Sequence, residues 1–322
     1  MTADLSQQPD RRKDANGNDG LARLLDHVAD LAPVRAAIVH PCDALSLAAA
    51  LDVRDAGLVE PVLVAPRARL DAAAEEAGID ISSLPVEDVP HSHAAAMRAA
   101  ELAREGDVEI MIKGSLHSDE LMSAVVASAS GLRTKRRVSH CFVIQTPHYP
   151  RPFLVTDAAV NLEPHLLQKA DIVQNAIDLA RVLGIGTPKV AILAAVETVN
   201  PSMQATLDAA ALCKMADRGQ ITGGVLDGPL AFDNAVSMEA AKTKGIASPV
   251  AGQADILVVP DLESGNMLAK QLIFMGQAAS AGIVLGAKVP VVLTSRADPR
   301  ESRMASCAIA LMLAHHNRTS PP

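Results

Sequence analysis

The chain has 322 residues, of which 49% are hydrophobic, 20% are charged and 2% are aromatic. This apolar content supplies a globular core and argues against intrinsic disorder. The net charge is −8 and aromatic side chains are few, which disfavours nucleic-acid binding, because that function needs a basic face and stacking platforms.

Residues 1–20 are polar and lack the apolar stretch of a secretory signal, so we expect a disordered, solvated tail. No run approaches about 20 apolar residues, and we therefore expect no membrane span. Cys42, Cys141, Cys213 and Cys307 are widely separated and form no CxxC pair. This spacing favours a reducing cytoplasm and disfavours both a disulfide framework and a zinc site.

From residue 21 onward, short apolar runs alternate with amphipathic stretches. Strands are predicted at residues 36–40, 61–65, 108–113, 139–145, 153–156, 190–194, 221–226, 256–260, 282–285 and 291–294. Helices are predicted at residues 43–51, 94–104, 119–129, 164–183, 202–217, 235–244, 266–277 and 299–315. Continuous Val, Ile and Leu runs are typical of strands covered on both faces. The alternation predicts an α/β fold with a mostly parallel sheet.

A domain boundary is predicted at residues 146–152, where TPHYPRP carries closely spaced prolines. The first α/β domain would span residues 21–150 and the second residues 151–288. The last strand and helix, residues 289–322, are expected to return to the first domain.

The strongest candidate site is the segment LTSRADPRES, in which a predicted strand delivers Ser295 and Arg296 to its carboxyl end. Ligands of open α/β sheets bind at such ends. Asp298 is predicted as the N-cap of the next helix, with Pro299 and Glu301 in its first turn. A helix N-terminus favours anions and an arginine can clamp a phosphate. A capped helix with a surface arginine is an equal alternative.

Further polar groups follow other predicted strands. Lys113 and Gly114 end the run IMIKG, and a phosphate contact or a solvated loop fits both. In DLESGNMLAK, Gly265 permits close approach to a ligand, and Asn266 and Lys270 share one helix face. An ordinary strand–helix loop is the alternative.

Two more groups complete the candidates. Asp227 is predicted at a strand end before a Gly228–Pro229 turn, as a site carboxylate. Arg136 and Arg137 precede the strand at residues 139–145, where they would bind phosphate or be solvated. The sequence contains no GxGxxG, GxxxxGK[ST] or HExxH motif. The candidate substrate-binding residues are therefore Lys113, Gly114, Arg137, Asp227, Gly265, Asn266 and Lys270.

In the order MIKGSLHSDELM, TDAAVN, GPLAFDNA, PDLESGN and LTSRAD, these segments resemble the phosphate acetyl/butyryltransferase family, or phosphotransacylases. The segments LDGPLA and LTSRAD are most similar to those of the butyryl branch. The resemblance implies reversible transfer of an acetyl or butyryl group between coenzyme A and orthophosphate, by direct attack in a ternary complex. It implies acyl-CoA and phosphate as substrates, and neither a metal nor another cofactor.

The resemblance also implies a two-domain α/β fold like that of isocitrate and isopropylmalate dehydrogenases, an active-site cleft between the domains, and a homodimer. By resemblance, Ser295 donates to the carbonyl oxygen or thiolate, and Arg296 holds the phosphate. Acetyl-type members carry an acidic base seven positions after that serine, where this chain has Ser302. Glu301 becomes the candidate base, although Asp298 is also near.

A second departure is Phe274, which stands where acetyl-type members carry a phosphate-binding arginine. Lys270 or Lys113 would then have to supply the second phosphate donor. Two other functions stay open. One is a metal- and NAD-dependent dehydrogenase on the same fold, which would need an aspartate cluster that the sequence does not clearly offer. The other is a non-catalytic acyl-CoA or acyl-phosphate binding protein.

Overall fold

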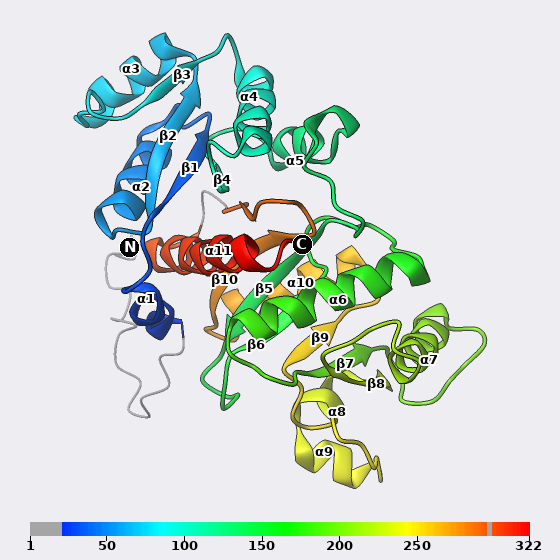
Figure 1. Cartoon of the computed structure of the whole chain (residues 1–322). Helices are drawn as coiled ribbons and strands as arrows, with labels where there is room; N and C mark the ends of the chain where they lie inside the picture. The colour runs from blue at the N-terminus through cyan, green and yellow to red at the C-terminus, as the bar shows by residue number, and fades with distance from the viewer. Residues whose placement is uncertain (1–20, 295–297) are drawn as a thin grey trace, which may run out of the picture.

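The computed structural model describes residues 21–294 and 298–322, which form one sheet with helices on both faces (Figure 1). The strands lie in the order β3-β2-β1-β4-β11-β10-β5-β6-β9-β7-β8. Their bounds are β1 Val34–Val39, β2 Val59–Ala65, β3 Val86–Asp88, β4 Ile110–Lys113, β5 Ser139–Gln145, β6 Phe153–Thr156, β7 Lys189–Leu193, β8 Val225–Leu230, β9 Ile256–Val258, β10 Ala279–Leu285 and β11 Val291–Val292.

The helices fill the connections between these strands. Their bounds are α1 Ala22–Val28, α2 Ala44–Asp55, α3 Arg67–Ala77, α4 Ser92–Glu105, α5 Ser118–Val126, α6 Leu166–Val182, α7 Gln204–Asp217, α8 Phe232–Val236, α9 Met238–Thr243, α10 Leu262–Phe274 and α11 Arg300–Thr319, with a short 3₁₀ turn η1 at Ser128–Ser130. The long helix α11 crosses the middle of the molecule and packs against β10, α1 and α2 (Figure 1).

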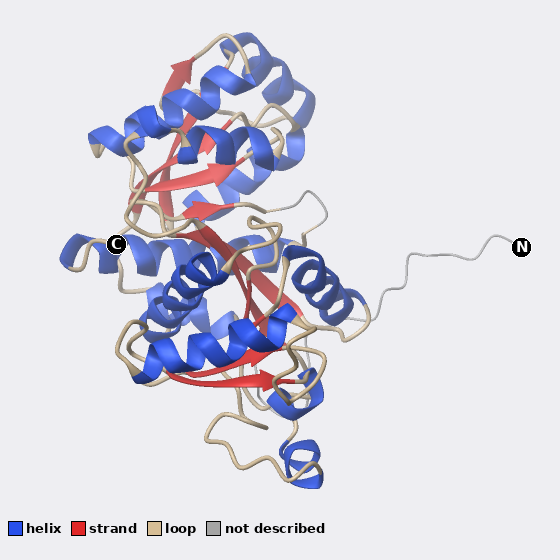
Figure 2. Ribbon diagram, turned by 90° about the vertical axis from the view of Figure 1, so that its right-hand side faces the viewer, coloured by secondary structure: helices blue, strands red, loops and turns tan. Residues whose placement is uncertain are grey.

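Strand direction changes only in the middle of the sheet. β3, β2, β1, β4 and β11 are parallel, as are β6, β9, β7 and β8, whereas β10 and β5 are antiparallel to their neighbours. Twist of about 20–25° per strand turns the sheet by roughly 120–150° between β1 and β9. The carboxyl ends of both parallel groups therefore face the same side, as the arrowheads in Figure 2 show.

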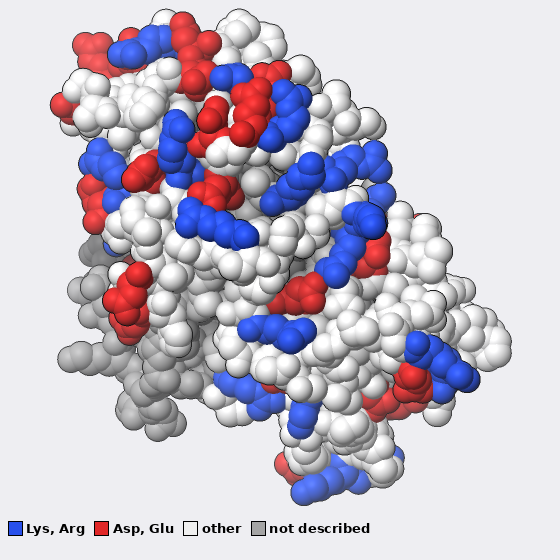
Figure 3. Space-filling model, viewed as in Figure 1, with Lys and Arg blue, Asp and Glu red and all other residues white. Residues whose placement is uncertain are grey.

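Alternating side chains of each strand supply two layers of core. In β1, Ile38 packs in the layer that contains α2, α3 and α11, and Val39 packs in the layer that contains α4 and α5. A third apolar cluster lies around β6, β7 and β9 and includes Phe153. On the face drawn in Figure 3, acidic and basic side chains are interspersed among uncharged areas.

Most expected elements are present, and the main error concerns β8. The strand runs from Val225 to Leu230, so the prediction of a strand at 221–226 is wrong. Gly228 and Pro229 lie inside the strand and do not form a turn after it. A Cβ on Gly228 would lie 2.7 Å from the Ile192 carbonyl oxygen, so close packing on β7 explains this glycine.

Smaller differences lie at other elements. The helix predicted at 235–244 is divided into α8 and α9, and the sequence pattern did not reveal β3, α1 or α3. β11 pairs in parallel with β4, next to the first group of strands. The sheet is mixed, but seven of its ten strand pairings in the described part of the chain are parallel, so the expectation of a mostly parallel sheet is confirmed. The two-domain division at residue 150 stays a prediction.

Candidate active site

The carboxyl end of β4 provides the first part of the site. The Gly114 amide donates to the Val39 carbonyl at 2.9 Å, and a Cβ on Gly114 would lie 2.6 Å from that same oxygen. Only glycine permits this approach between the ends of β4 and β1. Lys113 is half-buried, and its Nζ donates to the Leu116 carbonyl at 3.3 Å. The local backbone thus orients the lysine at the sheet edge.

Lys113 and Gly114 line one pocket together with Thr294 and Arg303. Thr294 directly precedes Ser295 in the chain. Ser295 and Arg296 themselves lie outside the described residues, and their proposed roles stay predictions. Thr294 is the last described residue before this segment, and it lines the same pocket as Lys113 at the carboxyl end of β4.

The start of α11 differs from the prediction. Its N-cap is Pro299, with φ −63° and ψ 159°, and no side chain of a described residue caps the helix, so the prediction that Asp298 is the N-cap is wrong. The Asp298 carbonyl oxygen instead accepts a hydrogen bond from Arg303 Nη1 at 2.7 Å. Glu301 is exposed in the first turn, whereas Ser302 is 8% exposed. Burial thus leaves Glu301 as the accessible carboxylate of that turn.

A second polar cluster surrounds the loop that follows β6. Arg137 is exposed, and its Nε donates to Asn161 Oδ1 at 2.7 Å. The buried Asp157 carboxylate accepts from the backbone amides of residues 159, 160 and 161 at 3.0, 3.1 and 3.2 Å. Burial raises the pKa of Asp157 above its ordinary value, although these hydrogen bonds oppose the shift. The loop is therefore a rigid platform next to Arg137.

Helix α10 packs directly on this loop. Asn266 Nδ2 donates to the Ala158 carbonyl at 3.2 Å, and a Cβ on Gly265 would lie 2.7 Å from the Asp157 carbonyl oxygen. Gly265 therefore permits close packing within the protein, in addition to any approach to a ligand. The helix begins at Leu262 after the Asp261 cap, four residues before the predicted start. Lys270 is exposed one turn beyond Asn266.

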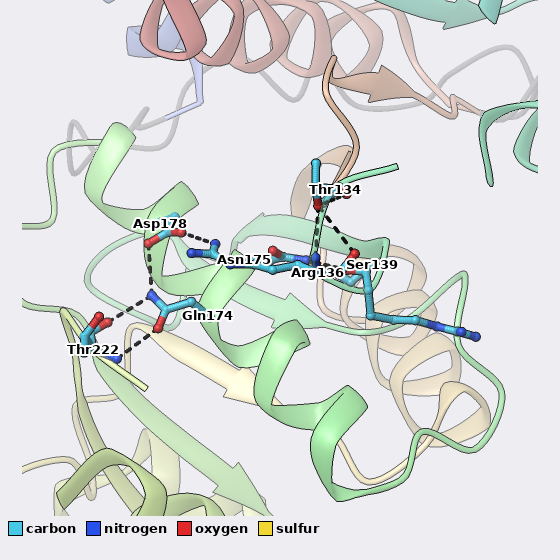
Figure 4. Close-up of polar contacts among 9 residues, drawn as sticks. Thr134, Arg136, Ser139, Gln174, Asn175, Asp178 and Thr222 are labelled. Carbon is cyan, nitrogen blue, oxygen red and sulfur yellow. Dashed lines mark hydrogen bonds and ion pairs between the residues drawn. The ribbon is translucent and has the colours of Figure 1, made fainter. Parts of the chain in front are cut away.

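Two candidates do not join these clusters. Asp227 lies within β8, at the far edge of the sheet from β3, and its Oδ1 accepts from the Gly228 amide at 2.9 Å. Burial, with a smaller contribution from Asp227, raises the pKa of the Cys213 thiol to about 12. Arg136 forms an ion pair with Asp178 of α6 (Figure 4), so it anchors a helix. Its backbone amide donates to Thr134 Oγ1 at 3.1 Å.

The residue patterns also missed His40 and Arg303. His40 is 5% exposed and has a left-handed backbone with φ 54°. Its Nδ1 lies 3.2 Å from Ser115 Oγ, and that hydroxyl donates to the His40 carbonyl at 2.7 Å. Burial lowers the pKa of His40. For His40, the available signal was the polar run HPCD at the end of a predicted strand. For Arg303 the sequence offered no signal, because a helix turn separates it from the strand end.

Comparison with known proteins gives a consistent assignment. The family model for phosphate acetyl/butaryl transferase matches residues 90–311. The chain belongs to the phosphate acetyl/butyryltransferase family. A phosphate acetyltransferase of Rhizobium meliloti is 56% identical over 92% of this chain and 94% of its own length. A phosphate butyryltransferase of Clostridium acetobutylicum is 41% identical over 83% of this chain and 89% of its own length.

A solved member of the phosphotransacylases has the same overall structure. The crystal structure of a branched-chain phosphotransacylase from Enterococcus faecalis matches with a TM-score of 0.77 and 30% identity, covering 88% of this chain and 99% of that one. Among the described residues, no group of three or more His, Cys, Asp or Glu side chains is arranged to hold a metal ion. Nor is any helix in the described ranges long and apolar enough to cross a membrane.

Proposed function

We propose that this family member transfers a short acyl group reversibly between coenzyme A and orthophosphate, with acetyl as its preferred group. The observation that carries the proposal is that Lys113, Gly114 and Thr294 line one pocket. Thr294 directly precedes Ser295 and Arg296 in the sequence. The acetyl preference is supported by the 56% identity to a phosphate acetyltransferase, against 41% for a butyryltransferase.

The reaction needs a thiolate, because the neutral thiol of coenzyme A is a poor nucleophile. Glu301, exposed at the start of α11, accepts the thiol proton. The sulfur attacks the carbonyl carbon of the acyl phosphate, the new C–S bond forms, and the C–O bond to phosphate breaks. Orthophosphate leaves with the bonding electron pair, and the reverse reaction follows the same steps.

Charge develops on the carbonyl oxygen and on the leaving phosphate. Ser295 donates to the carbonyl oxygen, and Arg296 forms two hydrogen bonds to the phosphate. Lys113, at the end of β4, adds a positive charge at the same edge of the sheet. Arg137, Asn266 and Lys270 form a second group around the loop after β6, and we assign this group to the anionic parts of coenzyme A.

We further propose that the two halves of the sheet are domains with the active site in a cleft between them, as in isocitrate and isopropylmalate dehydrogenases. The common direction of the two sets of carboxyl ends supports this arrangement (Figure 2). We also propose a homodimer that associates through α10. Met267 and Phe274 of that helix are 65% and 75% exposed, and their seven-residue spacing places them on one face; its C-cap residue Met275 is 80% exposed beside them.

The deciding experiment mixes the purified chain with coenzyme A and acetyl, propionyl or butyryl phosphate. Loss of free thiol together with appearance of thioester absorbance is expected, fastest with acetyl phosphate. Arg296→Ala should lower turnover by about a hundredfold or more while the circular dichroism spectrum stays unchanged. Coenzyme A binding without turnover of any acyl phosphate would instead identify a binding protein.

The role of Glu301 has a separate test. The wild-type rate should fall in acid as this carboxylate is protonated, whereas Glu301→Gln should be slow throughout and lack the acid limb. A Glu301→Gln profile identical to that of the wild type would reject Glu301 as the base.

A further inference from the structure

A small pocket opens between α2 and α11, beneath the carboxyl ends of β1, β4 and β11. Its inner wall is formed by small and branched apolar side chains, which are Ile38, Ala49, Ala50, Val53, Ile112 and Cys307. Ile38 and Ile112 are register partners on adjacent strands, so they form a continuous floor. Val53 lies two helical turns into α2, and the pocket therefore extends away from the sheet edge.

The pocket is polar at the sheet edge. Lys113, Thr294 and Arg303 belong to its wall, and each lies at or just past the end of a strand or in the first turns of α11. Leu45 and Ser46, from the first turn of α2, complete the wall there. The first turn of α11 lies at this edge, and its partial positive charge adds to those of the lysine and arginine, whereas the N-terminus of α2 is capped by the Asp43 carboxylate. The site favours an anionic group outside and an alkyl group inside.

Arg303 has an unused donor at this position. Its Nη1 is held by the Asp298 carbonyl at 2.7 Å, whereas its Nε is buried without a hydrogen-bond partner among the described residues. A buried guanidinium N–H without an acceptor is costly, so a ligand oxygen is the expected partner. The fixed Nη1 contact means that the guanidinium is already oriented for that ligand.

The volume of the pocket limits the alkyl group. It encloses about 40 Å³, and one water-sized group needs roughly 10–15 Å³ on the same measure. About three such groups fill it. With its carbonyl carbon counted, an acetyl or propionyl group brings two or three carbons and fits this space, whereas the four carbons of a butyryl group require the walls to move.

We propose that this pocket holds the acyl chain of the acyl phosphate and sets chain-length preference, with Arg303 as an additional donor to the bound acyl phosphate. This inference rests on the proposed function and deepens it, because it assigns the acyl end of the substrate to specific residues.

The test compares kcat/KM for acetyl, propionyl and butyryl phosphate. The wild type should prefer acetyl or propionyl to butyryl phosphate by roughly tenfold or more, since one methylene is worth about 10- to 200-fold. Val53→Ala enlarges the pocket and should raise the butyryl-to-acetyl ratio by roughly tenfold. Ala49→Val fills it and should lower the propionyl-to-acetyl ratio by a similar factor. Arg303→Gln should raise KM for all three acyl phosphates.

The matched control is Val64→Ala, because Val64 is 0% exposed but belongs to the core layer on the opposite face of the sheet. It should leave both ratios unchanged. If Val53→Ala does not fold, Ala49→Val still decides the question. Active, folded variants with wild-type ratios would overturn the pocket assignment and leave the proposed function intact. A wild-type chain that turns over no acyl phosphate would remove both.

Discussion

Arg137 and Asn161 are joined by a 2.7 Å hydrogen bond that holds an exposed guanidinium against a buried amide. Asn161 Nδ2 in turn donates to the Val138 carbonyl at 2.8 Å and to the Asp157 carboxylate. The rigidity of the loop after β6 thereby extends to the arginine. A surface arginine without such contacts would not be held in one position, so removal of Asn161 should weaken any substrate contact that Arg137 makes.

Asn161→Ala should impair substrate binding more than chemistry. The loss of one hydrogen bond to a charged group corresponds to about 1.5–3 kcal/mol, so we expect KM for coenzyme A to rise roughly tenfold with a smaller change in kcat. Steady-state kinetics at varied coenzyme A checks this. Arg137→Gln is the matched variant and should reproduce the increase, whereas an unchanged KM in both variants would show that Arg137 binds no substrate.

Gly265→Ala should damage the same platform from the side of α10. The new methyl would lie 2.7 Å from the Asp157 carbonyl oxygen and from Val259 Cγ2, so the helix or the loop has to move. Overpacking of this kind costs about 1–3 kcal/mol. Urea unfolding should show that loss. Gly186→Ala is the control, because no atom of the described residues lies within 4 Å of its Cβ position, and equal stability of the two variants would contradict the packing role.

The sequence predicted strands well where apolar runs were continuous. β5 and β6 have the predicted bounds, because both strands are buried on each face and turn residues follow them. β8 was displaced by four residues, since Asp, Gly and Pro within a strand imitate a turn. Only the contact of Gly228 with β7 reveals the true register, and that contact links residues distant in the sequence. Local patterns therefore failed where tertiary packing decides.

The candidate site residues show the same difference between local sequence patterns and tertiary packing. The sequence indicated Lys113, Gly114 and Asn266 because they follow strands, and the structure places them at strand ends or in the next helix. It gave no indication that Gly265 packs against the loop after β6, or that Arg303 belongs to a pocket. Asp227 was predicted at a strand end, whereas the structure places it within β8, and its role as a site carboxylate stays a prediction.

The ion pair between Lys169 of α6 and Asp208 of α7 should be important for stability. Its Nζ–Oδ2 distance is 2.6 Å, and the two side chains are only 8% and 7% exposed. Asp208→Ala leaves a buried ammonium unpaired, so the free energy of unfolding should fall by about 3–5 kcal/mol. Asp217→Ala breaks the exposed Lys214–Asp217 pair and should cost less than about 1 kcal/mol. Similar losses in urea unfolding would refute the distinction.

Phe274→Glu should dissociate the proposed dimer. Phe274 is 75% exposed at the end of α10, and a carboxylate there would have to be desolvated in an interface between two copies. Light scattering after size exclusion should give the mass of a dimer for the wild type and of a monomer for the variant. Leu25→Glu alters an exposed apolar residue of α1, away from α10, and should leave the mass unchanged. A monomeric wild type would remove the interface.

His140 should make the protein less stable in mild acid. It is 2% exposed in β5, its Nδ1 has no hydrogen-bond partner in the described part of the chain, and burial lowers its pKa from 6.5 to about 4. Between these two values the unfolded chain binds a proton that the folded chain does not, so stability falls as the pH decreases from about 7 to 4.

The full effect is about 3 kcal/mol, at about 1.4 kcal/mol for each unit of pKa difference, and it saturates below pH 4, where the folded protein also takes up the proton. His140→Gln cannot titrate, so its free energy of unfolding should lose about 3 kcal/mol less than that of the wild type over this range. Urea unfolding at pH 7, 5.5 and 4 measures the difference. The control variant His148→Gln, at an exposed position, should keep the wild-type pH dependence. Parallel plots of unfolding free energy against pH for the wild type and His140→Gln would show that folded His140 accepts the proton as readily as it does in the unfolded chain.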